Sequence, residues 1–509
     1  MEYALKASEM KACDQNTVTR IGIPSLVLME RAALAACQEA EGLIPGKGRV
    51  LVIAGSGNNG GDGLAVGRLL ALAGKQVTFF MAGDSKKLTE ETRAQIKILE
   101  NLGFSIQGKL EAAEYDMVID AFFGIGLSRE IAGDACQVIG RMNFYKSQGA
   151  FILSLDIPSG ICADTGRIMG CAVRADLTVA FAFAKRGHLL YPGREYCGRL
   201  KIKDIGIPRK AFGNTLPAAF YYEIEDAAGL LPKRAPAGNK GTFGKGLVVA
   251  GSRDMCGACL LCGRSLLKTG AGMARIISPS CNRTVIQQGI PEAVLSAFDG
   301  TPSGEKVKES LAWADAVVAG PGLGMGEEAY LLMKYLLEDT AIPMVVDADG
   351  LNLIAANGSL QELAARRQAQ KLVLTPHPGE LARLLNIQVQ EVLKDREGAA
   401  RKLAGRFSCV VVAKDAATIV VAPGEERMYI NVSGNDGMAS AGSGDVLAGI
   451  TGGLLAQGMS AFQAASLGSY LHGLAGDYAA REKGRYGMTA GDIACSIPFV
   501  MKSLENCSA

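Results

Sequence analysis

The chain has 509 residues, more than one hydrophobic core accommodates, so two or three domains are expected. Hydrophobic residues make up 49% and charged residues 20%, and the formal net charge is +2, which excludes a disordered chain and argues against nucleic-acid or lipid-surface partners. The N-terminus has no apolar signal core, and no run of about 18 apolar residues occurs, so no membrane span is expected. Thirteen cysteines without a signal peptide predict reduced thiols and a cytoplasmic protein.

Short β-branched runs alternate with helical patterns along nearly the whole chain, which predicts α/β architecture with parallel sheets. The first series of predicted strands is 50–54, 76–81, 117–120, 151–156 and 177–183. The second series is 247–250, 274–278, 316–319, 344–347, 372–375 and 410–413. The stretch "LPKRAPAGNKGTFGKG" between them lacks periodicity, so the boundary is predicted near residues 225 to 237.

The glycine-rich stretch "GSGNNGGDG" follows the predicted strand 50–54 and precedes a helical pattern. Gly55, Gly57 and Gly60 match the G-x-G-x-x-G fingerprint, but Asp62 would repel a dinucleotide pyrophosphate, and no acidic residue closes the next strand. A turn that offers amides and a carboxylate suits hydroxyls, carboxamides or a cation better. The alternative is that Asp62 is only a helix N-cap and the asparagines only turn residues.

Two more predicted strands end on aspartates. "DMVIDAFFGIGLSRE" places Asp120 before a glycine-rich loop, and "FILSLDIPSG" places Asp156 before Ser159. Because the carboxyl ends of parallel strands share one crevice, Asp120, Asp156, Asn59 and Ser159 are expected to converge. They would supply oxygen ligands for a cation and a carboxylate for acid–base work, unless these aspartates merely cap the next helices.

In order, the motifs "SEMKACD", "GIPSLVLMERAA", "GSGNNGGDG", "VIDAFFGIGL" and "LDIPSG" resemble the epimerase half of the bifunctional NAD(P)H-hydrate repair enzymes, over about 210 residues. The resemblance implies interconversion of R- and S-NAD(P)HX, the nicotinamide nucleotide hydrated at C6. It implies substrate contacts from Asn58, Asn59, Gly60, Gly61, Asp62, Gly124, Ile125, Gly126, Leu127, Ser128, Arg129, Glu130 and Asp156. It also implies a potassium ion held by Asn59, Asp120 and Ser159, with Asp156 as the candidate acid–base group.

The second half contains "GNDGMASAGSGDVLAGITGGLLAQG", a flexible turn followed by a helix. The N–H groups of Gly442, Ser443 and Gly444 can face an anion at the positive end of the helix dipole. Asp445 stands at the helix start, where it could take a proton from a hydroxyl during phosphoryl transfer, or could simply be an N-cap.

Together with "VVAGPGLG", "VVDADGLN", "LTPHPGE" and "VVVAKDAATIV", this stretch resembles the ribokinase-like dehydratase half of the same enzymes, from residue 235 onward. The resemblance implies dehydration of S-NAD(P)HX with ADP (ATP in some relatives) and Mg²⁺, through a phosphorylated hydroxyl. Asp445 would be the base and a hydrate contact, and Ala258, Gly322 and His377 would border the hydrate. The implied nucleotide site comprises Lys414, Asp415, Ala416, Ala417, Thr418 and Gly444.

This sequence departs from the family pattern at a few positions: Arg31 in "LMERAA", Asn239 in "GNKGTFG" and Asp415 in "KDAAT", where the family usually has glycine. His377 taken alone would more often be a buried structural hydrogen-bonding residue than a ligand. Cys256, Cys259 and Cys262 have the spacing that begins a ferredoxin cluster, but they also share one face of a helix, where small buried cysteines are common.

The resulting prediction is a Rossmann-like three-layer epimerase domain (1–222) followed by a ribokinase-like α/β dehydratase domain (235–509), in a cytoplasmic homo-oligomer. Its partners would be NAD(P)HX and ADP or ATP, with no nucleic acid and no membrane. Two other classes stay open: an NAD-dependent dehydrogenase built on the first loop, and a ribokinase-like small-molecule kinase fused to a dinucleotide-binding domain. Reduced cofactor formed from NAD plus a metabolite would favour the former, and accumulation of a phosphorylated substrate the latter.

Overall fold

The computed structural model describes residues 1–110 and 113–508. The chain forms two compact units: an N-terminal unit, Tyr3–Ala219, and a C-terminal unit that begins at Phe220 and also includes Met1 and Glu2. Within the described residues, no helix combines the length and the apolar character that a membrane crossing requires.

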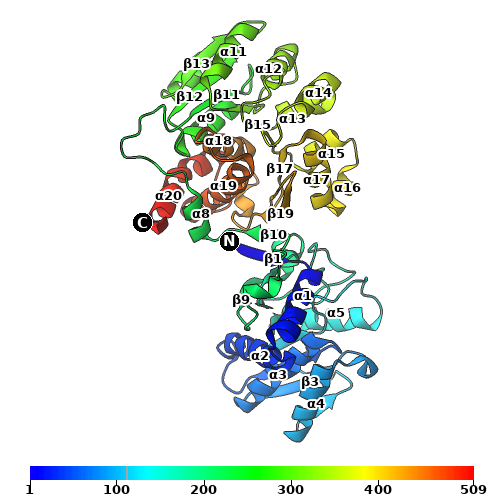
Figure 1. The fold of residues 1–509 in the computed structure, drawn as a ribbon. Helices are drawn as coiled ribbons and strands as arrows, with labels where there is room; N and C mark the ends of the chain where they lie inside the picture. The colour runs from blue at the N-terminus through cyan, green and yellow to red at the C-terminus, as the bar shows by residue number, and fades with distance from the viewer. Residues whose placement is uncertain (111–112, 509) are drawn as a thin grey trace. The chain divides into compact units, whose positions relative to one another are not determined.

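The N-terminal unit is a three-layer α/β fold (Figure 1). Its sheet has the order β4-β3-β2-β5-β6-β7-β9, with all neighbours parallel. The strands are β2 (Arg49–Ala54), β3 (Gln76–Met81), β4 (Ile106–Gln107), β5 (Met117–Ala121), β6 (Phe151–Leu155), β7 (Leu177–Phe181) and β9 (Arg199–Lys203). Outside this seven-stranded sheet, β1 (Glu2–Leu5) pairs in parallel with β8 (Ala184–Lys185).

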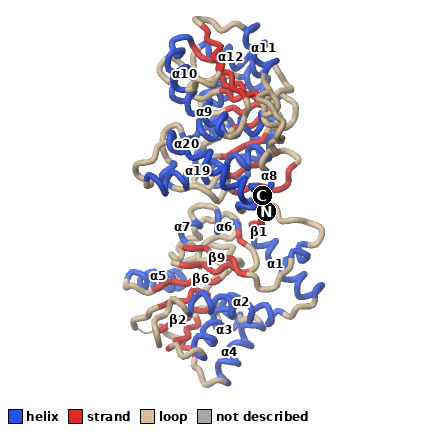
Figure 2. Tube along the Cα trace, turned by 90° about the vertical axis from the view of Figure 1, so that its left-hand side faces the viewer, coloured by secondary structure: helices blue, strands red, loops and turns tan. Residues whose placement is uncertain are grey.

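Helices cover both faces of this sheet. They are α1 (Ala7–Asn16), α2 (Ser25–Glu41), α3 (Asn58–Leu72), α4 (Glu90–Asn101), α5 (Asp134–Ser147), α6 (Arg186–Leu189) and α7 (Gly193–Tyr196), with the short turns η1 (Thr17–Ile21), η2 (Ser85–Lys87) and η3 (Arg209–Phe212). Figure 2 shows the strands between α5 on one side and α2 and α3 on the other. Side chains alternate accordingly: Leu51 and Ile53 join the core under α5, whereas Val52 meets Gly63 and Gly67 of α3.

The predicted strands are present, but the structure adds elements that were not predicted. β4 and β9 form the sheet edges, and β9 reads "RLKIK", whose lysines hide the alternation that marks a strand. The expected linker is also shorter than 225–237, because α8 (Ile224–Leu230) is a helix of the C-terminal unit that packs against α20 (Ala490–Ser508).

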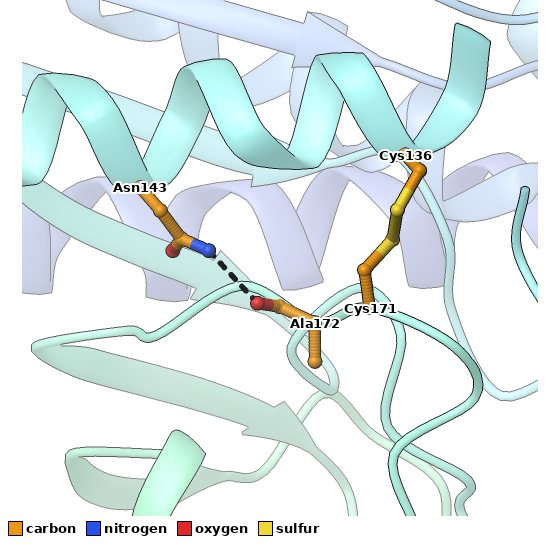
Figure 3. The surroundings of a disulfide bond; sticks show 4 residues. All are labelled: Cys136, Asn143, Cys171 and Ala172. Carbon is orange, nitrogen blue, oxygen red and sulfur yellow. Dashed lines mark hydrogen bonds between the residues drawn. A yellow bond between two sulfur atoms is a disulfide. The ribbon is translucent and has the colours of Figure 1, made fainter. Parts of the chain in front are cut away.

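The expectation that every cysteine is a reduced thiol is wrong for one pair. Cys136 in the first turn of α5 and Cys171 in the loop before β7 form a disulfide, with Cα atoms 6.1 Å apart (Figure 3). The same loop is fixed to α5 by Asn143, whose side-chain amide donates to the Ala172 carbonyl at 2.9 Å. The remaining eleven cysteines are free. Sequence separation alone could not reveal that the fold brings these two positions together.

The C-terminal unit is built on a larger sheet, in which strands β13-β12-β11-β14-β15-β16-β17-β18-β19 follow one another. These are β11 (Lys245–Val249), β12 (Met273–Pro279), β13 (Val294–Phe298), β14 (Ala316–Ala319), β15 (Met344–Val346), β16 (Leu372–Leu374), β17 (Val410–Ala413), β18 (Ile419–Ala422) and β19 (Glu425–Ile430), while β10 (Ala219–Tyr221) spans the boundary between the units. Pairing is parallel from β13 to β17 and antiparallel for β18 and β19.

Helices pack on this sheet as in other α/β folds. They are α9 (Cys256–Lys268), α10 (Arg283–Gly289), α11 (Gly304–Trp313), α12 (Glu327–Glu338), α13 (Asp349–Ala356), α14 (Gly358–Ala365), α15 (Pro378–Leu385), α16 (Val389–Lys394), α17 (Arg396–Phe407), α18 (Ser443–Ala456) and α19 (Ala461–Lys483), with the short turns η4 (Ser280–Asn282) and η5 (Asp436–Met438). α18 packs closely against α9, α19 and β14 because its glycines let neighbours approach; a Cβ on Gly452 would lie 2.1 Å from Val318.

Candidate active sites

The N-terminal unit contains a cavity of about 820 Å³ at the carboxyl ends of its parallel strands. Residues from both of the loops expected there line its wall: Asn58, Asn59, Asp62, Gly124, Ile125, Gly126, Leu127, Ser128, Arg129 and Asp156. Gly60, Gly61 and Glu130 are outside that wall, and Asp120 and Ser159 lie buried. The structure thus joins most of the predicted contact residues around one space of ligand size.

The glycines of the first loop serve the packing of the backbone. A Cβ on Gly55 would lie 2.0 Å from the carbonyl oxygen of Phe122, and a Cβ on Gly60 would lie 1.9 Å from the carbonyl oxygen of Gly55. No larger residue fits at either position, whether or not a phosphate binds. The G-x-G-x-x-G pattern is therefore explained by a tight turn between β2 and α3. Asn58, Asn59 and Asp62 of the same stretch line the cavity.

Asp156 follows β6 with a positive φ of 61°, a conformation that aspartate tolerates better than most residues. Its carboxylate accepts a hydrogen bond from the Phe181 backbone N–H at 3.3 Å and forms an ion pair with Lys185. Lys185 is 1% exposed and also donates to the Phe181 carbonyl at 3.0 Å. Asp156 is therefore not a helix cap but a charged group held in place beside the cavity.

Asp120 forms a polar cluster with Ser159 beneath this site. Its carboxylate accepts hydrogen bonds from the Ser154 hydroxyl at 2.8 Å, from the Ser159 backbone N–H at 2.9 Å, and from the Ser159 hydroxyl. Asn59 donates to the Phe123 carbonyl at 3.2 Å, and the Ser159 hydroxyl lies 3.2 Å from the same oxygen. Among the described residues, the buried Oδ1 of Asn59 has no hydrogen-bond partner. An orphaned amide oxygen beside a carboxylate, a hydroxyl and a carbonyl is a donor set that fits an alkali cation.

Two further carboxylates, Asp14 of α1 and Asp62 of α3, belong to the cavity wall. Burial raises the pKa of Asp62 well above its usual value, and the charges of Asp156 and Asp14 add to that effect. Burial also raises the pKa of Asp14 to about 6, with Lys185 lowering it and Asp156 raising it. The cavity thus groups three acids around one lysine, and titrating groups whose pKa values are shifted in this way are typical of catalytic clefts.

In the C-terminal unit, the predicted site residues follow four neighbouring parallel strands. The Gly322 loop follows β14, Asp347 follows β15, His377 lies beyond β16, and Lys414 follows β17. The Lys414 backbone N–H donates to the Pro376 carbonyl at 2.9 Å, which fixes two of these loops side by side. The carboxyl ends of the strands therefore form one crevice, as expected for an open α/β sheet.

Lys414 is the centre of this crevice. Its ammonium group lies 2.6 Å from Asp347 Oδ1 and 3.9 Å from Glu380 Oε2. Burial alone would lower the pKa of Lys414, but Asp347 and Glu380 raise it, and the net direction is upward. A Cβ on Gly444 would lie 3.3 Å from both Asp347 Oδ2 and Lys414 Nζ, so the glycine-rich turn reaches this charge pair.

Asp445 lies in the first turn of α18, behind Gly442, which has a φ of 89°. Burial raises the pKa of Asp445 to about 7, and the charge of Asp347 contributes in the same direction while Lys414 opposes it. Asp445 makes no N-cap hydrogen bond, because the N-cap position is Gly442. A half-buried carboxyl that titrates near neutral pH suits a general base.

Of the three residues expected to border the hydrate, Ala258 and Gly322 lie together, and His377 lies on the loop between β16 and α15. A Cβ on Gly322 would lie 2.9 Å from the Ala258 Cβ, so these two residues are in contact. The Gly322 loop is connected to Asp445 through Asp349. The Gly324 backbone N–H donates to Asp349 Oδ2 at 2.8 Å, and the charge of Asp349 raises the pKa of Asp445.

His377 has a structural role in addition to the predicted one. Its Nδ1 accepts hydrogen bonds from the Gly379 and Glu380 backbone N–H groups at 3.0 and 3.4 Å, which caps α15. Burial, Lys414 and Arg383 lower its pKa, so the ring is neutral at neutral pH. With Nδ1 used as an acceptor, Nε2 carries the remaining proton.

The loop 414–418 connects β17 to β18 and is braced by Arg396 of α17. Arg396 donates to the carbonyls of Ala413 at 3.3 Å and Ala417 at 2.7 Å, and its guanidinium lies 3.0 Å from Asp415 Oδ2. Asp415, which replaces the usual glycine of the family, is therefore used to hold the loop. No sequence motif marked Arg396.

Comparison with known proteins agrees with both halves of the fold. Residues 25–187 match the family described as YjeF-related protein N-terminus, and residues 246–499 match the NAD(P)H-hydrate dehydratase family. A bifunctional NAD(P)H-hydrate repair enzyme from Thermofilum pendens is 38% identical, covering 98% of this chain and 96% of the relative. The chain belongs to the bifunctional NAD(P)H-hydrate repair enzymes.

A second relative and a solved structure extend this result. The Moorella thermoacetica enzyme is 36% identical, covering 99% of this chain and 97% of its own length. A solved ribokinase-like superfamily protein from Enterococcus faecalis has a TM-score of 0.51 and 25% identity, covering 57% of this chain and 98% of its own. The ribokinase-like fold of the second half is thereby confirmed.

Sequence reasoning missed several residues of both sites, among them Asp14, Lys185, Asp347 and Glu380. The three cysteines with ferredoxin-like spacing lie on a helix, which is the alternative that the sequence favoured. Cys256, Cys259 and Cys262 lie on α9 as free thiols, and the described residues contain no group of three or more His, Cys, Asp or Glu arranged to hold a metal.

Proposed function

We propose that the protein restores hydrated nicotinamide nucleotides by two reactions in two separate sites. The N-terminal cavity interconverts R- and S-NAD(P)HX, and the C-terminal crevice dehydrates S-NAD(P)HX to NAD(P)H with ADP, or ATP as in some relatives. The observation that carries this proposal is that each unit places a carboxylate beside its own loops, Asp156 in the first and Asp445 in the second. Membership of the repair-enzyme family supports both assignments.

In the N-terminal cavity, Asp156 is the acid–base group. The ion pair with Lys185 and the hydrogen bond from Phe181 fix its carboxylate, so it meets the substrate with little rearrangement. Asn58, Asn59 and Asp62 offer amide and carboxyl groups to the hydroxyl and carboxamide of the hydrate, and residues Gly124 to Arg129 form the facing wall. The predicted contacts Gly60 and Gly61 would act through their backbone, and Glu130 from the edge of the same loop.

A potassium ion fits beneath this cavity. Asn59 Oδ1, the Asp120 carboxylate and the Ser159 hydroxyl would hold it, because they cluster there and the amide oxygen lacks a partner among the described residues. The bound ion would supply positive charge close to the substrate loops. Since Asn59 also lines the cavity, this donor set would fix the orientation of a substrate contact.

In the C-terminal crevice, Asp445 takes the proton of the hydrate's C6 hydroxyl as the nucleotide's phosphoryl group is transferred to that oxygen. The backbone N–H of Gly444 and the positive end of α18 stabilise the transferring group, and Lys414 adds a positive charge beside it. Phosphate is a much better leaving group than hydroxide, and its departure from C6 together with the loss of a proton from C5 restores the dihydronicotinamide. Ala258, Gly322 and His377 would border the hydrate.

The nucleotide is expected at the loop comprising Lys414, Asp415, Ala416, Ala417 and Thr418, with Gly444 near its phosphates. Mg²⁺ would enter with those phosphates, and the carboxylates of the crevice are the oxygen ligands that this ion accepts. We assign no individual ligand. We further propose a cytoplasmic homo-oligomer, which size-exclusion chromatography with light scattering tests.

The experiment that tests this function uses mixed R- and S-hydrate of NADH or NADPH with ADP or ATP. The absorbance of the dihydronicotinamide should return until both epimers are consumed. If a phosphorylated metabolite accumulates and no dihydronicotinamide appears, the protein is a kinase and this proposal is wrong.

A further inference from the structure

Asp14, the last residue of the motif "SEMKACD", is a carboxylate on the wall of the N-terminal cavity to which the resemblance assigns no role. Met10, Asp14 and Val18 all line the cavity and are four residues apart, so α1 and the turn after it face the cavity with one stripe. The other two members of the stripe are apolar. Within the described part of the chain, no hydrogen bond or ion pair of the Asp14 carboxylate is present. An acid without a structural partner on a cavity wall is free to meet a ligand.

Charged groups from several elements surround Asp14. Lys185 and Asp156 both act on its pKa, and Asp62 of α3 shares the same environment. Lys11 of its own helix and Glu91 of α4 also line the cavity. Burial with these neighbours raises the pKa of Asp14 to about 6. Such a group holds a proton in part of the molecules at neutral pH and releases it readily, which is what a general acid requires.

Epimerisation at C6 moves the hydroxyl from one face of the ring to the other. On the route through an N1=C6 iminium ion, the hydroxyl leaves from one face and a water adds to the opposite face, so an acid on one side and a base on the other serve the two steps. Asp156 comes from the end of β6 and Asp14 from α1, so the two acids enter the cavity from different elements. Asp156 raises the pKa of Asp14, and both residues line the same cavity.

We propose that Asp14 is a second catalytic residue of the epimerisation, serving one face of C6 while Asp156 serves the other. This inference rests on the proposed epimerase function of the cavity. The ion pair with Lys185 holds the Asp156 carboxyl group in place, and Asp14 acts in its protonated form, which its raised pKa of about 6 makes available.

The reaction balances as two proton transfers. Asp14 gives its proton to the C6 hydroxyl, the C6–O bond breaks with its electron pair on the departing water, and the lone pair of the ring nitrogen N1 forms an N1=C6 double bond. A water on the opposite face then adds to C6 and gives a proton to Asp156, while the double-bond electrons return to N1. One proton is lost by Asp14 and one is gained by Asp156, and exchange with solvent restores both groups.

The test compares Asp14→Asn, Asp14→Glu and Gln15→Glu in the full chain without nucleotide, so that only epimerisation of pure R-hydrate is followed. Gln15 is the exposed neighbour on α1, and its substitution makes the reverse chemical change outside the cavity wall. We expect kcat of Asp14→Asn to fall by about 10² to 10⁴ with KM within about threefold of wild type. Asp14→Glu should recover part of the rate, and Gln15→Glu should match wild type.

A second arm needs no substitution in α1. Wild-type protein epimerises R-hydrate in heavy-oxygen water, and mass spectrometry measures the label in the S-hydrate, with an enzyme-free sample as control. We expect solvent oxygen in the S-hydrate formed by the enzyme. Complete retention of the original oxygen would overturn the two-face step.

The Asp14 assignment would also be overturned if Asp14→Asn epimerised within about threefold of wild type. If the variant loses stability, its melting temperature and its dehydration of S-hydrate reveal that, and Asp14→Glu then decides between a structural and a catalytic carboxyl. Wild-type protein that fails to epimerise R-hydrate at all would instead refute the proposed function, so the two failures are distinguishable.

Discussion

Lys414, whose side chain is 19% exposed, and the buried Asp347 form an ion pair between the loops after β15 and β17, with 2.6 Å between Nζ and Oδ1. Asp347 is 2% exposed, so its charge is compensated by Lys414 rather than by water. The pair lies beside Gly444, and Asp347 is the charged neighbour that most raises the pKa of Asp445. The ion pair therefore contributes to the stability of the C-terminal crevice, and its Asp347 also raises the pKa of Asp445, the proposed base.

Lys414→Met should destabilise the C-terminal unit and abolish dehydration. Removing one partner of a buried pair leaves an uncompensated charge and costs about 3 to 5 kcal/mol. Thermal unfolding and the turnover of S-hydrate measure the two effects. The double variant Lys414→Met with Asp347→Asn should regain much of the stability without regaining activity. If Lys414→Met alone is as stable as wild type, the ion pair does not stabilise the C-terminal unit.

Asp156→Asn should abolish epimerisation and leave dehydration of pure S-hydrate intact, because its carboxylate lies in the cavity of the N-terminal unit. The amide keeps the shape of the side chain but not its basicity. Chiral chromatography of the hydrate after incubation without nucleotide measures the result. If Asp156→Asn consumes R-hydrate at the wild-type rate, Asp156 is not the acid–base group.

Potassium should accelerate epimerisation, because Asn59, Asp120 and Ser159 present the oxygen ligands for a cation. Replacing potassium by a bulky organic cation is expected to lower the epimerisation rate of wild-type protein. Ser159→Ala should lower the rate in potassium and lose most of the response to the ion. An unchanged wild-type rate in the organic cation would disprove the potassium assignment.

Asp445→Asn should stabilise the protein more at pH 8 than at pH 5. The folded-state pKa of about 7 is above the ordinary value of 3.8, so the stability gained from the protonated form is present at low pH and lost as pH rises through about 7. The amide carries no charge to desolvate at either pH. A gain of about 2 to 4 °C in melting temperature at pH 8, with a smaller gain at pH 5, is expected. An equal gain at both values would contradict the raised pKa.

The central strands of both sheets could be predicted from sequence because they are short apolar runs buried on two faces. Strands such as β9 and β19, with "RLKIK" and "EERMYI", could not, because charged side chains interrupt their apolar runs. In β9 these side chains reach solvent because the strand lies at the sheet edge. Helix α8 was assigned to the linker because its sequence is short and lies next to a Pro-, Gly- and Lys-rich run.

The residues of the candidate sites also include some that the sequence predicted and some that it did not. Residues on motif loops, such as Asp156 and Asp445, were found because strand ends of a parallel sheet converge by topology. Lys185 was missed because its pairing with Asp156 spans 29 residues and no motif joins them. Asp14 belongs to the motif "SEMKACD" but was not singled out, because the sequence does not show that this position of α1 lines a cavity.

The most direct test of two sites in one chain follows dihydronicotinamide absorbance from pure R-hydrate with ADP or ATP. R-hydrate must be epimerised before it is dehydrated, so Asp156→Asn and Asp445→Ala should each restore almost no absorbance alone. Their equimolar mixture should restore it, because the first variant dehydrates the S-hydrate that the second releases. Full recovery with either variant alone, or none with the mixture while wild type is active, would contradict the account.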